Sequence, residues 1–290
     1  RANEGVRLSG FDGLVELQEL HNYISQGQSV WEMGVNTDIK GKADDDYDTR
    51  TANPLTVNPA DTTFVFVTPR RWTGKESWGQ QKRAQGHWKD VRVLDADDLE
   101  GWLSLAPGVA AWLAPILGKP SAGVFSADAY WTNWASVTRP ALAPEVVLAG
   151  WNDDPRETVQ RFLTAPPNAI SISAESREVA AVYLAALLIS DGDALERDHA
   201  RAVFVENEAS WAALVHQGKP SLLVPLFDRQ DHVTAAVGQG HHVVVPLGRR
   251  AKSSTVKLQR QFRRSLREAL DTLEVPDDQK GALATLGRRS

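Results

Sequence analysis

The stretch that decides the fold begins with Gly10-Phe11-Asp12-Gly13 and continues to Ser29-Val30-Trp31-Glu32-Met33-Gly34. The first four residues are typical of a tight turn. Residues 14–17 predict one strand and residues 30–33 predict a second, with the polar segment 25–28 between them. The stretch therefore indicates a strand pair that starts directly after Asp12.

A helix is expected immediately after this strand pair. Residues 39–50 predict it, and Asp38 is a suitable N-cap because its side chain can accept a hydrogen bond from the first turn. Lys42, Asp46 and Arg50 recur at i, i+4 and i+8. These three side chains therefore share one face of the helix.

The rest of the first half alternates strands and helices, which is typical of an α/β core. The apolar run Thr63–Thr68 predicts a strand buried on both faces, and Pro69 ends it. The other expected elements are a helix over 75–85, a strand over 91–95, a helix over 98–103 capped by Asp97, and a short helix over 107–117. A Gly/Pro/Ser-rich linker at 118–123 predicts a domain boundary, so the first domain is expected to cover 1–120.

The second half has the pattern of a doubly wound parallel sheet, in which short apolar strands are separated by helices or helix-length loops. The expected strands are 146–150, 169–173, 202–205, 221–226 and 242–246, and the expected helices are 157–163, 176–190 and 208–215. We expect this second domain to cover 125–250. Residues 251–290 predict a basic helical segment.

Composition sets limits on the class of protein. The chain has 290 residues, of which 42% are hydrophobic and 24% are charged, as in a globular protein of two domains. It has no cysteine, which excludes disulfides and thiolate metal sites. No apolar run or leader pattern predicts a membrane span or a signal peptide, so we expect a cytoplasmic protein without a membrane partner. Because the chain starts at Arg1, we expect a fragment with further domains or subunits outside it.

Asp12 and Glu32 are the candidate metal ligands. Glu32 stands between Trp31 and Met33, where a charge costs free energy unless it is paired or bound to a metal. If the strand lies at an edge, Glu32 faces solvent instead. Two carboxylates can hold a hard cation such as Mg²⁺, which polarises a phosphate and activates a water molecule. Glu16, in the first strand, either joins this cluster or faces water.

These residues resemble the core of the PD-(D/E)xK nucleases, in the branch close to Mrr-like restriction endonucleases. In that family a G-x-D-G turn carries the first carboxylate and the next strand carries E/Q-x-K. Asp12 and Glu32 match the two carboxylates, whereas Gly34 stands at the position of the lysine. Some members carry the lysine on the following helix, which makes Lys42 the first candidate and Lys40 the second.

The resemblance covers roughly residues 5–118 and implies a restriction-endonuclease-like domain with a mixed sheet. It also implies a DNA endonuclease that uses Mg²⁺ or Mn²⁺, as found in bacterial antiviral defence proteins. DNA is then the partner, and a homo-oligomer is expected because many such nucleases cut as dimers. The alternative is an inactive domain of the same fold that binds nucleic acid or a partner subunit, since E-x-G replaces E-x-K.

Basic residues form two clusters although the net charge is −5. Residues 70–92 form the first cluster. The candidate phosphate-binding residues are four from this cluster and Arg50 from the preceding helix: Arg50, Arg70, Arg71, Lys75 and Lys82. Residues 249–268 predict either a second phosphate-binding stripe or a solvated helix face. Trp72, Trp78 and Trp88 lie within the first cluster, where they either stack on bases or pack at the sheet edge.

The second domain is similar to a P-loop NTPase core in its spacing of strands and helices, but it lacks the phosphate-binding loop. Residues 173–178 contain neither glycine nor lysine, and Glu175 and Glu178 would repel phosphate. We therefore expect an ATPase-like or Rossmann-like fold without a nucleotide cofactor. His241 and His242 point to opposite faces of a strand, so they make a poor metal pair.

Overall fold

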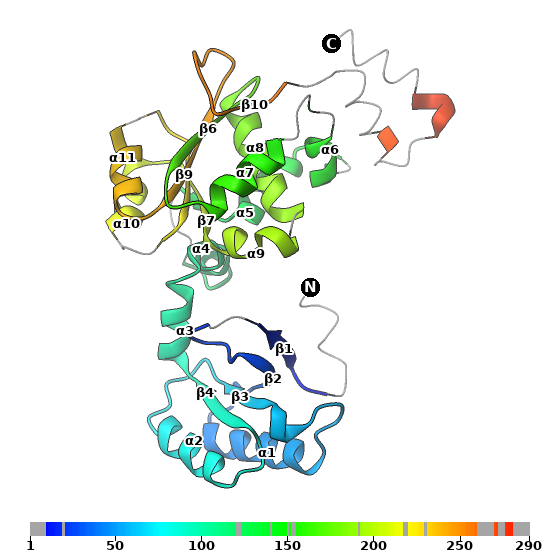
Figure 1. The fold of residues 1–290 in the computed structure, drawn as a ribbon, viewed down its shortest axis with the longest axis vertical. Helices are drawn as coiled ribbons and strands as arrows, with labels where there is room; N and C mark the ends of the chain where they lie inside the picture. Colours follow the sequence, from blue (N-terminus) through cyan, green and yellow to red (C-terminus); the bar gives the residue numbers. More distant parts are fainter. Residues whose placement is uncertain are drawn as a thin grey trace. The chain divides into compact units, whose positions relative to one another are not determined.

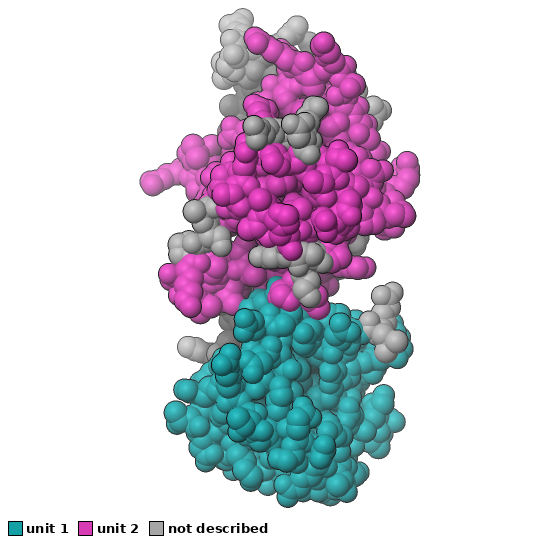
Figure 2. Space-filling model, turned by 90° about the vertical axis from the view of Figure 1, so that its left-hand side faces the viewer, with its two compact units in different colours: residues 1–103 teal, residues 104–290 magenta. Residues whose placement is uncertain are grey.

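The structure is a computed structural model that describes residues 10–18, 21–119, 123–139, 141–149, 151, 155–190, 192–216, 220–228, 231–259, 270–271 and 276–280. The chain divides into two compact units, unit 1 (residues 1–103) and unit 2 (residues 104–290) (Figure 2). Both units combine helices with a mixed sheet, which confirms the α/β class. Within the described ranges, no helix has the length and apolar character needed to cross a lipid bilayer.

Unit 1 is built on a four-stranded sheet. Its strands, in spatial order, are β1 (Gly13–Leu17), β2 (Gly27–Met33), β3 (Thr63–Val67) and β4 (Asp90–Leu94). β1 runs antiparallel to β2, whereas β2, β3 and β4 are parallel. All five residues of β3 are buried, which confirms the strand predicted to be covered on both faces.

Helices cover both faces of this sheet (Figure 1). The helical elements of unit 1 are α1 (Ile39–Ala52), a single 3-10 turn η2 (Pro59–Asp61), α2 (Lys75–Ala84) and α3 (Ala96–Leu103). Tyr47 of α1 and Trp78 of α2 pack with Phe64 and Phe66 of β3 on one face. Trp102 of α3 packs on the other face, in a cluster with Trp31 of β2, Val65 of β3 and Leu94 of β4.

The predicted order of elements in unit 1 is confirmed, with one correction at a helix start. Asp38 caps α1 as expected, since its Oδ1 accepts from the Gly41 amide at 2.9 Å. Asp97 does not cap α3, because the helix already begins at Ala96. Asp95 and Asp98 accept hydrogen bonds from each other's backbone amides there, so Asp95 supplies the cap one residue before the helix.

Unit 2 contains a six-stranded sheet. Its strands, in spatial order, are β10 (Val256–Lys257), β6 (Ala169–Ser173), β9 (His242–Leu247), β8 (Leu222–Pro225), β7 (Ala202–Val205) and β5 (Val124–Phe125). The strands β10, β6, β9, β8 and β7 are parallel, and β5 adds to β7 in the antiparallel direction. The sheet is therefore mixed, and parallel except at one edge.

The helices of unit 2 pack around this sheet (Figure 1). They are α4 (Pro107–Ile116), α5 (Ala127–Ala135), α6 (Pro144–Leu148), α7 (Pro155–Thr164), α8 (Arg177–Ser190), α9 (Gly192–Arg201), α10 (Glu208–His216) and α11 (Asp231–Gly238). Every residue from Ala180 to Leu188 in α8 is buried, as expected of a helix that is apolar on all sides.

One predicted strand of the second half is wrong. Residues 146–150 were expected to form a strand, but α6 covers most of this segment. Pro144 stands at the first helical position, where its fixed backbone angle favours a helix. The apolar side of this turn packs against α8, with Val147 buried, so the run of valines reflects one buried helix face.

The domain boundary also differs from the predicted linker at 118–123, because the division falls between Leu103 and Ser104. Helix α4 packs on α9 and β7 and so belongs to unit 2. Gly108 allows this close approach, since a Cβ atom there would lie 2.7 Å from the carbonyl oxygen of Ala202. For 251–290, predicted to be helical, the structure places β10 near its start, whereas the described residues 270–271 and 277–280 are helical. Residues 260–269, 272–275 and 281–290 lie outside the described part.

Candidate active site

Glu32 is a buried carboxylate near the end of β2. Only 3% of the residue is exposed, so the alternative in which it faces solvent is wrong. Burial raises the pKa of Glu32, the nearby Arg50 guanidinium opposes this shift, and the negative charges of Asp12 and Asp46 add to it. A buried carboxylate with two acidic neighbours is costly unless cations compensate it.

Asp12 lies beside Glu32 because of the register of the strand pair. β1 and β2 are antiparallel with Gly13 opposite Trp31, which places the residue before β1 at the end of β2. The Oδ2 atom of Asp12 accepts a hydrogen bond of 2.7 Å from the backbone amide of Met33, and the side chain is otherwise exposed. The structure therefore brings together the two carboxylates that the sequence singled out.

Lys42 reaches the same end of the sheet from the first turn of α1. Its Nζ lies 2.5 Å from Oδ1 of Asp46. Its aliphatic stem passes over Gly34, where an added Cβ would lie 2.9 Å from Lys42 Cγ and 2.8 Å from Cζ of Phe66. Lys42 thus lies over Gly34 just after the end of β2, and the absence of a side chain at Gly34 leaves room for it.

Lys40 points to a different group of charges. Its side chain is 66% exposed, and its Nζ lies 2.6 Å from Oδ2 of Asp44. Asp44 also accepts from Trp78 and lies 3.0 Å from Nζ of Lys82. These donors outweigh its partial burial and hold the pKa of Asp44 at about 2. Of the two candidate lysines, the structure places Lys42, and not Lys40, at the end of β2.

Glu16 is not part of this cluster. It pairs with Gln28, while Glu32 lies four residues further along β2. At ~3.3 Å per residue, this offset separates the two along the strand by roughly 13 Å. Glu16 is exposed, and its side chain accepts only a weak hydrogen bond of 3.4 Å from Gln18. The structure thus matches the alternative in which Glu16 faces water.

Most of the candidate phosphate-binding residues have carboxylate partners. Arg50 donates to Glu32, Arg71 pairs with Asp97, Lys75 pairs with Asp95 and Asp98, and Lys82 pairs with Asp44 and Asp48. Arg70 differs from the others, because its Nε donates to the carbonyl oxygen of Val35 at 3.0 Å and the residue is exposed. It follows β3 at the same end of the sheet as Glu32, so Arg70 is the best placed of these cations for a phosphate.

The tryptophans of this region mainly pack in the core. Trp78 and Trp88 are 3% and 4% exposed, and both belong to the core cluster beneath α1 and α2. Trp72 is partly buried and lies 5.6 Å from Trp78 between ring centroids. Two of the three rings are therefore too buried to stack on bases, and the packing alternative is confirmed for them.

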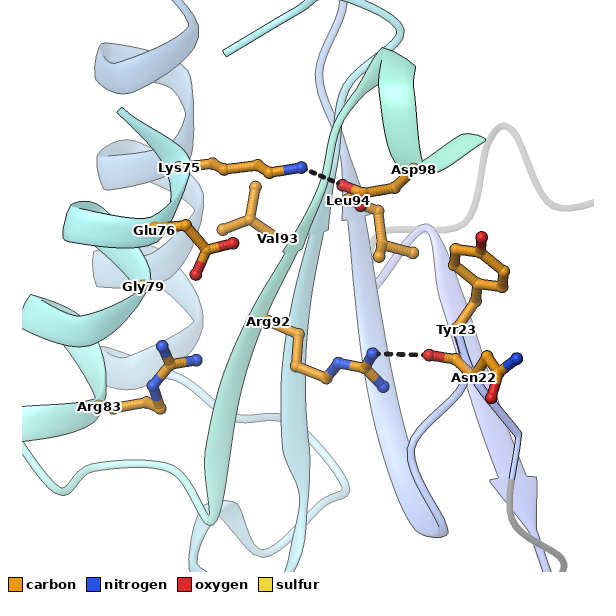
Figure 3. A pocket seen from close by; sticks show the side chains of 10 residues that line it. All are labelled: Asn22, Tyr23, Lys75, Glu76, Gly79, Arg83, Arg92, Val93, Leu94 and Asp98. Carbon is orange, nitrogen blue, oxygen red and sulfur yellow. Dashed lines mark hydrogen bonds and ion pairs between the residues drawn. The ribbon is translucent and has the colours of Figure 1, made fainter. Parts of the chain in front are cut away.

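A cavity of about 210 Å³ lies elsewhere in unit 1, between α2 and β4 (Figure 3). Lys75 on its wall is bound to Asp98 at 2.5 Å, and Arg92 donates to the carbonyl oxygen of Asn22 at 3.0 Å. The charges that line it compensate one another to a large extent. Neither Asp12 nor Glu32 lines this cavity, so it is separate from the carboxylate site.

Asp46 also belongs to this site, although its sequence context did not predict a role for it. Its Oδ1 contacts Lys42, while its Oδ2 is buried and has no hydrogen-bond partner among the described residues. Its charge also acts on Glu32. The i, i+4, i+8 spacing of Lys42, Asp46 and Arg50 was the signal that these three residues belong together.

The carboxylates fit a hard divalent cation. Among the residues that the structure describes, no three His, Asp or Glu side chains gather closely enough to hold a metal ion by themselves. Mg²⁺ usually needs only one or two protein carboxylates, with water and substrate phosphate as its other ligands. Asp12 and Glu32 are a suitable pair, because the register of β1 and β2 places them side by side and the charge of Asp12 acts on Glu32.

In unit 2, the segment between β6 and α8 is the one in which a phosphate-binding loop would be expected, and it contains neither glycine nor lysine. It borders a hollow of about 430 Å³, lined by Glu175, Leu247, Gly248, Arg249, Arg250 and Ala251. Arg177, at the start of α8, is held by Asp228 and by the carbonyl oxygen of Leu226. Backbone amides free to cradle a phosphate would need glycine, and this segment has none.

His241 and His242 have internal partners. Nδ1 of His241 accepts from the Ser221 amide at 3.2 Å. His242 lies between the carbonyl oxygen of Ala165, 3.0 Å from Nε2, and Arg201, 3.3 Å from Nδ1. Burial lowers the pKa of both histidines. Both histidines therefore form hydrogen bonds inside unit 2, at the start of β9, where burial favours their neutral form.

Comparison with known proteins finds no protein-family model and no curated protein sequence that matches this chain. The function proposed below therefore rests on the residues and geometry of the site.

Proposed function

We propose that unit 1 is a metal-dependent DNA endonuclease domain that hydrolyses phosphodiester bonds with Mg²⁺ or Mn²⁺. The observation that carries this proposal is the meeting of Asp12, Glu32 and Lys42 at one end of the sheet, from three different elements. Gly34 supports the proposal further. The family motif has a lysine at the position of Gly34, and here the stem of Lys42 fills the space beside this glycine.

In this proposal Asp12 and Glu32 bind the cation. The bound cation supplies Lewis-acid chemistry, since it polarises the phosphate and lowers the pKa of a water molecule. Lys42 places a positive charge beside the phosphate, where it stabilises the charge that develops in the transition state. Asp46 holds the Lys42 ammonium in position through their 2.5 Å contact. Arg70 binds a flanking phosphate.

The test is cleavage of an end-labelled DNA duplex with Mg²⁺ or Mn²⁺, for the wild-type chain and Glu32→Ala. We expect cleavage by the wild type only and its loss in EDTA. Gel-shift measurements on the same samples report DNA binding separately. Absence of cleavage by the wild type, under conditions where it binds the duplex, would contradict the enzymatic function.

One observation favours a second candidate function. Arg50 already neutralises Glu32, so this carboxylate is satisfied within the protein. A nuclease fold that has lost its reaction and only binds DNA or a partner subunit would tolerate this pairing. Its DNA affinity would fall steeply with salt and would be the same with and without EDTA.

For unit 2 we propose an ATPase-like module that has lost nucleotide binding, within a protein of bacterial antiviral defence. Support comes from the parallel part of the sheet and from the segment after β6, where Glu175 stands and glycine and lysine are missing. The expected result is that ATP does not change the thermal unfolding of the chain. A rise in unfolding temperature with ATP and Mg²⁺ would contradict this assignment.

A further inference from the structure

Arg50, predicted from the sequence to bind phosphate, points into the protein. It lies in the last turn of α1, and its side chain is 20% exposed. Its Nε donates to Oε1 of Glu32 and its Nη2 donates to the carbonyl oxygen of Gly10. Its Cζ lies 5.1 Å from the centre of the Phe11 ring. One guanidinium therefore joins α1, strand β2 and the turn before β1.

This bridge matters because Asp12 lies just outside strand β1, which begins at Gly13. The residue precedes β1 and is exposed, and its own hydrogen bond is the one from the Met33 amide. Gly10 and Phe11, the two residues directly before it, are the ones that Arg50 contacts. The Met33 amide therefore contacts Asp12 itself, Gly13 is paired with Trp31 in the sheet, and Arg50 contacts the two residues before Asp12.

We propose that Arg50 is a positioning residue of the carboxylate site, which fixes the Gly10–Asp12 turn against Glu32 by bridging the two. The inference rests on the proposed metal site and adds to it. It replaces the phosphate-binding role of Arg50, because all three contacts of the guanidinium are to the protein. A planar guanidinium can hold two acceptors in one fixed geometry, whereas the ammonium of lysine is a single point of charge.

A simpler role is that Arg50 only neutralises the buried Glu32. Lysine would then serve as well, since it carries the same charge. Arg50→Lys separates the two roles, because it keeps a cation beside Glu32 and loses the bond to the Gly10 carbonyl or the one to Glu32. Arg71→Lys is the matched control in unit 1, because Arg71 forms an exposed pair with Asp97.

The first measurement is hydrogen exchange by mass spectrometry on the wild type, Arg50→Lys and Arg71→Lys, without metal or DNA. We expect about tenfold faster exchange in Arg50→Lys at residues 10–14 and at the Met33 amide, with the rest of unit 1 unchanged and Arg71→Lys like the wild type. Wild-type exchange in Arg50→Lys would overturn the proposal. Faster exchange throughout unit 1 would also overturn it, because Arg50 would then stabilise the whole unit.

The second measurement is calorimetric titration of the same proteins and Glu32→Ala with Mn²⁺ alone. Loss of a residue that orients metal ligands typically weakens metal affinity 10–100-fold, and we expect at least about tenfold for Arg50→Lys. Equal affinity of Arg50→Lys and the wild type, with binding lost in Glu32→Ala, would overturn the role of Arg50 and leave the metal site standing. Wild-type Mn²⁺ binding that persists in Glu32→Ala would instead contradict the metal site, while the exchange data still decide whether Arg50 fixes the turn.

Discussion

At the scale of single residues, Gly34 explains how the site accommodates a lysine from a neighbouring helix. The position is enclosed by the Phe66 ring and by the Lys42 stem, so a side chain there would displace one of them. Gly34 stands two residues after Glu32, and its lack of a side chain leaves room for Lys42. Gly34 and Lys42 are thus two parts of one packing arrangement.

Lys42 and Lys40 provide a matched pair for testing this arrangement. We expect Lys42→Ala to lower the DNA cleavage rate about a hundredfold or more, because a positioned cation at the transition state is worth this much. Lys40→Ala removes only an exposed pair with Asp44 and is expected to keep near wild-type activity. The measurement is the single-turnover rate with Mg²⁺ for both variants. A larger loss in Lys40→Ala would contradict the placement of Lys42.

Gly34→Ala tests the packing directly. The new methyl group would lie 2.8 Å from Phe66 Cζ and 2.9 Å from Lys42 Cγ, so we expect a loss of ~1–3 kcal/mol in the free energy of unfolding. Cleavage is expected to fall as well, because Lys42 must move. Gly238→Ala is the control, since nothing lies within 4 Å of a Cβ there. Urea unfolding gives the free energy of unfolding of both variants. If Gly34→Ala were as stable as the wild type, the space around Gly34 would not be enclosed.

Prediction from sequence was good for residues whose chemistry is local and poor for residues whose partners are distant. The strand pair was enough to bring Asp12 and Glu32 to one end of a sheet. The basic residues looked free in the sequence, yet Lys75 meets Asp95 and Lys82 meets Asp44 once α2 has packed. Such pairings join segments that only the folded structure brings together.

At the scale of elements, helix α1 determines the geometry of the site, because it carries Lys42, Asp46 and Arg50. Its sequence is polar and its helix-forming tendency is weak, so its position depends on Ala43 and Tyr47 in the core and on its N-cap. The N-cap lies four residues before Lys42. Any change at the start of α1 is therefore expected to affect the site.

Asp38→Ala tests this dependence. The side chain caps α1 through the 2.9 Å hydrogen bond from the Gly41 amide, and loss of an N-cap typically costs ~1 kcal/mol. We expect a fall of this size in the free energy of unfolding of unit 1 and a severalfold fall in cleavage rate. Asp45→Ala is the control, because Asp45 is an exposed residue of the same helix. Equal effects of both substitutions on cleavage would contradict the role of the cap.

The order of strands and helices was largely predictable, and the errors have physical causes. Apolar runs with flanking turns gave the strands of unit 1 and four of those in unit 2. The valines of α6 looked like a strand because a helix buried on one side and five residues long has too little sequence to show its period. The boundary was misplaced because α4 docks on unit 2 through Gly108, a contact invisible in the linker composition.

At the scale of the whole chain, the two units carry different kinds of buried charge. Unit 1 concentrates carboxylates and their cations around one end of its sheet. Unit 2 contains two buried histidines, His241 and His242, and a partly buried one, His199, whose pKa shifts in the opposite direction. Burial lowers the pKa of His241 and His242, with Arg201 acting in the same direction, whereas the carboxylate of Asp128 raises the pKa of His199.

The expected pH dependence of the stability of unit 2 follows from the directions of these pKa shifts. His241 and His242 bind protons more weakly when folded, so their contribution is present above the unfolded pKa of ~6.5 and is lost as pH falls below it. His199 has the opposite sign, because its pair with Asp128 strengthens as pH falls. His199→Asn is therefore expected to steepen the loss of stability between about pH 7 and about pH 5.5. Urea unfolding of the wild type and His199→Asn across this pH range checks the prediction. A shallower loss of stability in His199→Asn would contradict the directions given for the three histidines.

The central claim, that Asp12, Glu32 and Lys42 form one metal-dependent catalytic site, is tested most directly by plasmid cleavage. Wild type, Asp12→Asn, Glu32→Gln, Lys42→Met and the control Lys40→Ala are compared with Mg²⁺, with Mn²⁺ and with EDTA. We predict nicking or linearisation by the wild type and Lys40→Ala only, and none in EDTA. Cleavage that persists in Glu32→Gln, or a folded wild type that binds the plasmid and leaves it intact, would contradict the claim.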